Sequence, residues 1–239
     1  MKKLKENLPS AFNQHILSNG LRIIHEPSVS KVAYCGFAVD AGTRDELENE
    51  QGMAHFVEHL IFKGTAKRKA WHILNRMENV GGDLNAYTNK EETVIYSAFL
   101  TEHFGRAFEL LTDIVFHSTF PQREIEKETE VIIDEIQSYE DNPSELIFDD
   151  FEDLIFRGHP LGRNILGNPG QLKLFRSEDA AAFTSRFYHP AIWSFLFWAI
   201  WTLGRWCAGR KNSSRIYLPC SGQPPYATAP LCTRASCSA

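Results

Sequence analysis

Residues Gly52 to Thr65 read GMAHFVEHLIFKGT and contain the pattern H-x-x-E-H at His55, Glu58 and His59. The apolar residues of this stretch recur at helical spacing, which predicts a helix that ends by Gly64. Residues four apart share one face of a helix, so His55 and His59 can chelate a single metal ion. Glu58 lies close enough to that face to act on a metal-bound water as a general base.

The alternative interpretation is a solvated helix face, or a chance occurrence of a short pattern. No Lys or Arg occurs from Gln51 to Phe62, and apolar residues surround the two histidines. This composition favours a partly buried site. Two imidazoles and a carboxylate are ligands typical of a zinc ion that keeps one position open. The sequence therefore predicts zinc chemistry here, with one Zn²⁺ per chain.

Around this helix, the chain alternates hairpin strands with runs of helix. Asn19 and Gly20 between two apolar runs predict a tight hairpin. The predicted strands are 15–17, 21–25, 31–39, 84–87 and 93–100, and the further predicted helices are 70–80, 102–117, 122–139, 144–156 and 177–188. This order indicates an α+β fold, a two-layer domain of mainly antiparallel sheet with helices packed on one face.

Motifs spread over much of the chain resemble the pitrilysin/insulinase family of zinc metallopeptidases, and within it the bacterial branch similar to mitochondrial processing peptidase. H-x-x-E-H is the inverzincin signature, the reverse of H-E-x-x-H. The likeness covers about Leu17 to Pro190. Its motifs are GMAHFVEHLIFKGT at 52–65, GGDLNAYT at 81–88, the Glu-rich helix with Glu135, Asp141-Asn142-Pro143, HPLG at 159–162 and ILG at 165–167. The resemblance implies the N-terminal catalytic half-domain of a zinc endopeptidase that hydrolyses peptide bonds.

The resemblance also implies a third zinc ligand on a later helix. It places this ligand at Glu135, 76 positions after His59. Glu128 lies seven residues, or two helical turns, before Glu135, so the two share a face. By resemblance, Glu128 is a carboxylate that orients a ligating histidine and raises its basicity. A solvated acidic face is the interpretation for the other glutamates of this helix, Glu124, Glu126 and Glu130.

Substrate contacts follow from the same resemblance. Members of the family hold an extended peptide along an edge strand near the metal. The matching segment is 84–87, where Asn85 and Ala86 are expected to contact the substrate backbone, with an ordinary buried strand as the alternative. The expected partners are a peptide or unfolded protein as substrate and a second homologous half-domain or subunit.

Composition excludes other classes of partner. The 239 residues carry a formal net charge of −5, which gives no basic field to attract nucleic acid or an anionic membrane surface. The N-terminus has no apolar core of a signal peptide. The longest apolar run, 191–203, is shorter than the roughly 20 residues that span a bilayer. We therefore expect a cytoplasmic protein that binds neither nucleic acid nor membrane.

The end of the chain differs from its body. Residues 191–239 contain none of the 30 acidic residues but four of the five Trp and four of the five Cys. Read from the third base of each codon, codons from Ile192 onward permit MVFLVLGDMDFRKVV, the strand and Gly-Asp-x-Asp turn of the family. We expect a catalytic half-domain at 1–190 and a non-family, frameshifted and poorly ordered tail at 191–239. A genuine Trp-rich partner-binding or membrane-surface tail is the competing interpretation.

A shortened chain also changes the functional expectation. The alternative to an active peptidase is a truncated zinc-binding fragment, or a non-catalytic subunit, without activity on its own. The complete H-x-x-E-H pattern with Glu135 argues against a degenerate metal site.

Overall fold

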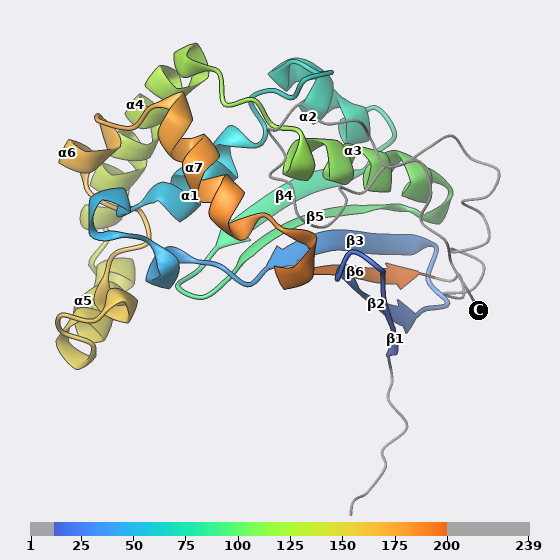
Figure 1. Ribbon diagram of the computed structural model, residues 1–239, viewed down its shortest axis with the longest axis horizontal. Helices are drawn as coiled ribbons and strands as arrows, with labels where there is room; N and C mark the ends of the chain where they lie inside the picture. The colour runs from blue at the N-terminus through green and yellow to red at the C-terminus, as the bar shows by residue number, and fades with distance from the viewer. Residues whose placement is uncertain (1–11, 200–239) are drawn as a thin grey trace, which may run out of the picture.

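A six-stranded mixed sheet forms one layer of the computed structural model, which describes residues 12–199 (Figure 1). The strand order is β1-β2-β6-β3-β5-β4, and each neighbouring pair is antiparallel except β2 and β6, which are parallel. The strands are β1 (Asn13–Ile16), β2 (Arg22–Pro27), β3 (Val32–Val39), β4 (Asp83–Thr88), β5 (Thr93–Leu100) and β6 (Trp193–Ala199).

The helices form the second layer. They are α1 (Met53–Leu60), α2 (Ala70–Glu78), α3 (Phe104–Phe116), α4 (Gln122–Glu140), α5 (Pro143–Ile155), α6 (Pro169–Leu172) and α7 (Ser177–Phe187). Figure 1 shows α1, α2, α3 and α7 on one face of the sheet. The predicted two-layer α+β fold is confirmed. None of the helices within residues 12–199 is long and apolar enough to cross a membrane.

An aromatic core joins α3 to the central strands. The ring of Phe37 on β3 meets Phe116 edge to face at a centroid distance of 5.4 Å and Trp193 at 5.5 Å. Phe108 on α3 meets Phe195 on β6 edge to face at 4.8 Å. Edge-to-face contacts of this kind add to the stabilisation from burial. The core therefore lies between α3 and the two strands β3 and β6.

Strand β6 extends the domain beyond the boundary expected after residue 190. It lies between β2 and β3 in the interior of the sheet, and its alternate residues from Trp193 to Ala199 are buried. The indole nitrogen of Trp193 donates to the carbonyl oxygen of Phe187 at 3.2 Å. The expected boundary rested on the composition after residue 190, on the end of the family motifs near Pro190 and on the shifted reading frame. The alternation of large apolar residues in 193–199 is nevertheless the pattern of a half-buried strand, and the frameshift stays a prediction. The rest of the expected tail, residues 200–239, lies outside the described residues.

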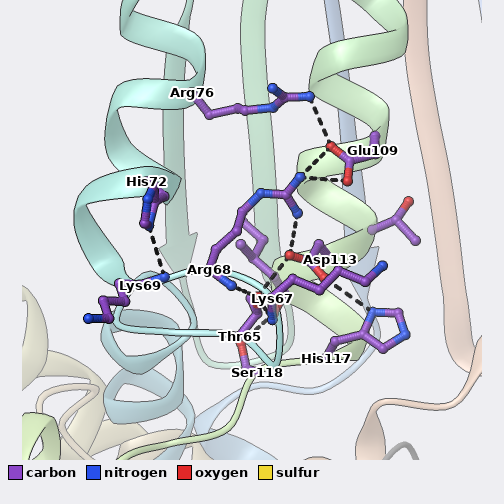
Figure 2. A network of polar contacts seen from close by, with 12 residues as sticks. Thr65, Lys67, Arg68, Lys69, His72, Arg76, Glu109, Asp113, His117 and Ser118 are labelled. Atoms are coloured by element: carbon purple, nitrogen blue, oxygen red, sulfur yellow. Dashed lines mark hydrogen bonds and ion pairs between the residues drawn. The ribbon is translucent and has the colours of Figure 1, made fainter.

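A polar network fixes the loop between α1 and α2 onto α3 (Figure 2). The Thr65 hydroxyl donates to Asp113 Oδ2 at 2.8 Å and accepts from the backbone N–H groups of Lys67 and Arg68 at 3.1 and 3.0 Å. The Arg68 guanidinium pairs with Asp113 and with both carboxylate oxygens of Glu109, at 2.6 and 2.8 Å. Because the Asp113 side chain is only 2% exposed, this loop depends on one buried carboxylate.

We expect Asp113→Ala to lower the free energy of unfolding by about 3 kcal/mol, because it removes a buried acceptor from both Arg68 and Thr65. Glu109→Ala is the matched control, since it removes the more exposed partner of the same guanidinium. Its expected cost is about 1 kcal/mol or less. Urea unfolding followed by circular dichroism measures both values. Equal losses in the two variants would contradict a special contribution from the buried carboxylate.

Candidate metal centre

Helix α1 carries the H-x-x-E-H pattern, and a buried carboxylate caps its first turn. Glu46 accepts hydrogen bonds from the backbone N–H groups of Gly52 at 3.0 Å and Ala54 at 2.8 Å. Gly52 has a φ of +92°, and a Cβ at this position would lie 2.8 Å from the Cα of Gly167. Glycine is therefore required here for two reasons: the backbone is in the left-handed region, and the loop that contains Gly167 leaves no room for a Cβ. The hydrogen bonds to Glu46 and the close contact with Gly167 thus both fix the start of α1.

The structure brings the three predicted ligand residues together. His55 and His59 project from α1, and Glu135 reaches them from α4, which packs against α1. The distance from Nε2 to the Glu135 carboxylate is 3.9 Å for His55 and 3.7 Å for His59. The ligand atoms of all three side chains lie within 4.8 Å of one another. One ion could therefore contact all three.

This donor set fits zinc. Two atoms that each lie about 2.1 Å from one zinc ion in a tetrahedral arrangement are about 3.4 Å apart, slightly closer than the separations found here. Burial, followed by the charge of His59, lowers the pKa of His55 to about 3. Its imidazole is therefore neutral at pH 7, the form that binds a metal. Three protein ligands leave a fourth position open, as in catalytic zinc sites.

Glu128, which the family resemblance predicts to orient a ligating histidine, lies between His59 and Lys63. Its Oε2 lies 3.2 Å from His59 Nδ1, and its Oε1 lies 2.7 Å from Lys63 Nζ. Burial alone would raise the pKa of Glu128, but the bonds from His59 and Lys63 hold that pKa below its usual range. An ionised carboxylate only accepts hydrogen bonds. The ring proton of His59 therefore belongs on Nδ1, which leaves the lone pair of Nε2 toward Glu135.

Glu58 lies on the same helix but outside the group of three ligand residues. Burial raises the pKa of its carboxyl group, and a hydrogen bond with the side chain of Thr88 opposes this rise. A carboxyl group with a raised pKa beside a metal site is suited to accept a proton and give it back. Thr88 ends β4, which packs against α1. The structure thus joins the predicted base to the predicted substrate strand.

Strand β4 carries the two predicted substrate contacts at the edge of the sheet. Its strand partner in the described sheet is β5, with Asn85 opposite Tyr96 and Ala86 opposite Ile95. Asn85 is exposed, and its side-chain oxygen accepts from the backbone N–H of Ala86 at 2.9 Å. The position of β4 at the edge argues against an ordinary buried strand. A further strand can pair with it in this geometry.

Sequence reasoning assigned no role to three residues at this site. Lys63 lies four residues after His59, a spacing that would put both on one side of a continuous helix, but α1 ends at Leu60. Thr88 closes the quoted GGDLNAYT stretch, but no spacing rule connects it with Glu58. Glu46 lies six residues before Gly52, too far away for the capping-box pattern to identify it.

Comparisons of sequence identify relatives over most of the chain. Residues 22–169 match the family model described as Insulinase (Peptidase family M16). An uncharacterized zinc protease of Rickettsia bellii is 39% identical over 188 residues, which cover 78% of this chain and 44% of that protein. The beta subunit of the mitochondrial-processing peptidase of Bos taurus is 40% identical over 172 residues, 72% of this chain and 35% of that protein. The chain thus spans less than half the length of these curated relatives.

Comparisons of structure identify the same fold at lower identity. A protease from Helicobacter pylori superposes with a TM-score of 0.78 at 20% identity, over 89% of this chain and 53% of that one. The first half of the periplasmic protease PqqL from Escherichia coli gives a TM-score of 0.78 at 22% identity, over 85% of this chain and 45% of that one. At 20% and 22% identity, these similarities show a shared fold and nothing more.

Proposed function

Because the chain belongs to the insulinase family of peptidases (peptidase family M16), we propose that it is the N-terminal catalytic half of a zinc-dependent endopeptidase. The observation that carries this proposal is the meeting of His55, His59 and Glu135 from two helices, with ligand atoms within 4.8 Å. Relatives from Rickettsia bellii and Bacillus subtilis are named zinc proteases. The proposed cofactor is one Zn²⁺ per chain, and the proposed half-domain continues through β6.

The residues beside the ligands have separate tasks in this reaction. Bound zinc supplies a Lewis acid that polarises the scissile carbonyl and acidifies the attacking water. Glu58 accepts the proton of that water on a carboxylate oxygen and then gives it to the leaving amine. The side chain of Thr88 lies beside Glu58 and opposes the rise that burial causes in the pKa of its carboxyl group. Glu128 keeps the ring of His59 oriented through Nδ1.

The substrate in this proposal is a peptide or an unfolded protein, because only an extended backbone can pair with the edge of β4. Asn85 and Ala86 lie in the middle of that edge. The contact between β4 and α1 brings a peptide bound there beside Glu58. Main-chain pairing gives affinity with little dependence on side chains.

A second homologous half, on the same polypeptide or another, completes the proposed active site. One relative is named as a subunit, and one solved structure is described as the first half of a protease. The chain covers 44% of the Rickettsia bellii relative. The alternative proposal is a chain that binds zinc but hydrolyses nothing by itself, either as a fragment or as a non-catalytic subunit.

Zinc content and hydrolysis measured on the same sample test the proposal. The purified chain is stripped of metal, titrated with Zn²⁺ and assayed on a quenched fluorescent peptide with and without EDTA. We expect one zinc per chain and hydrolysis that EDTA abolishes and added zinc restores. Bound zinc without turnover, alone and with a homologous second half, would support the non-catalytic alternative. A chain that takes up no zinc would overturn the proposal.

A further inference from the structure

Lys63 is connected to the metal centre through a buried carboxylate. It lies three residues beyond the end of α1, and its Nζ is 2.7 Å from Glu128 Oε1. The other oxygen of that carboxylate is 3.2 Å from His59 Nδ1. The Lys63 side chain is 27% exposed and that of Glu128 is 7% exposed. Ammonium, carboxylate and imidazole therefore form a continuous chain that ends at a proposed zinc ligand.

Each oxygen of the Glu128 carboxylate has a different partner. The ammonium of Lys63 holds Oε1, and this contact leaves Oε2 directed at the imidazole of His59. A hydrogen bond between two charged groups is stronger than one between neutral groups. Nε2 of His59 then lies 3.7 Å from Glu135 Oε2. Lys63 therefore influences the orientation of the His59 imidazole through Glu128.

The two histidines differ in this support. Among residues 12–199, Nδ1 of His55 is buried without a hydrogen-bond partner. Its ring packs against that of His59 at a centroid distance of 4.7 Å. The hydrogen bond with Glu128 thus orients the imidazole of His59 directly. It can affect the imidazole of His55 only through the packing of the two rings.

We propose that Lys63 is a positioning residue of the metal centre, which sets the affinity for zinc by holding Glu128 against His59. This inference rests on the zinc site proposed above. The competing interpretation is an ion pair that only ties the end of α1 to α4. Such a pair would affect the stability of the fold but not the zinc affinity of the folded protein.

Zinc affinity of the folded full chain distinguishes the two interpretations. Competition with a chelating dye measures it at a temperature where circular dichroism shows each variant to be folded. Lys63→Met is expected to bind zinc about 10- to 100-fold more weakly, the usual effect of residues that support a metal ligand. Lys127→Met is the matched control, because Lys127 also lies 2.7 Å from a glutamate of α4 but is 53% exposed. Its affinity should equal that of the unsubstituted chain.

Two further variants exclude a general effect on the fold. Lys63→Arg keeps a cation opposite Glu128 and is expected to restore most of the affinity, together with the visible absorption spectrum of Co²⁺ bound in place of zinc. In a Glu128→Gln background, Lys63→Met should cause no further loss, because the two residues act as one unit. This comparison also serves if Lys63→Met alone does not fold, since the double variant removes both charges.

The outcomes separate this inference from the proposed zinc site. Equal zinc affinity in Lys63→Met and the unsubstituted chain would overturn the inference and leave the site standing. A matching loss in Lys127→Met, or a further loss in the Glu128→Gln background, would also overturn it. An unsubstituted chain that binds no zinc would overturn both.

Discussion

Glu58→Gln is expected to lower the rate of peptide hydrolysis by about 10²- to 10⁴-fold, the usual contribution of a general base. Glutamine keeps the size and reach of glutamate but takes no proton from water. Zinc affinity should persist, because Glu58 lies outside the three ligand residues. The rate is measured on the quenched fluorescent peptide, with the preparation that hydrolyses it, either the chain alone or the chain with a homologous second half.

The control for this variant is Glu130→Gln, which removes an exposed carboxylate from α4. It matches the change in net charge and should leave the rate unchanged. A rate in Glu58→Gln that equals the rate in Glu130→Gln would contradict the role of Glu58 as the base. Loss of zinc from Glu58→Gln would instead assign this carboxylate to the ligand set.

Glu135→Gln should weaken zinc binding by more than about 100-fold, beyond the 10- to 100-fold range of residues that only support a ligand. The amide removes the charge that balances Zn²⁺ and is a poorer ligand than a carboxylate. Asp134→Asn is the neighbouring control, because Asp134 is also exposed on α4 but lies outside the ligand group. Equal affinities in the two variants would show that Glu135 does not bind the metal.

Local periodicity was sufficient to predict most elements of the fold. The predicted strand 93–100 has the bounds of β5, and the predicted helix 122–139 differs from α4 by one residue. Apolar residues recur in these segments at every second position or at helical spacing. Either spacing places them on one face of the element, which can then be buried against the rest of the domain. The family proposed from H-x-x-E-H and its companion motifs is confirmed by the match over residues 22–169. The roles of individual site residues stay predictions.

Features that depend on tertiary contacts could not be predicted from local sequence patterns. Nothing in the local pattern of 193–199 indicates that this segment lies between β2 and β3. Lys63 and Thr88 likewise acquire their contacts from α4 and α1, over separations that no helical or strand period relates. The absence of acidic residues after residue 190 likewise carries no information about strand pairing, and the frameshift expected there stays a prediction.

The order of the strands determines when this domain is able to fold during synthesis. In the described sheet, the hairpin of β1 and β2 reaches the other strands through β6, whose pairing with β2 joins Arg22 to Ser194. Contacts between residues so distant in sequence form slowly, because a long loop must close first. The hairpin of β1 and β2 can therefore join the rest of the sheet only after β6 has been synthesised. The sheet is completed by nearly the last residues of the described domain to be synthesised.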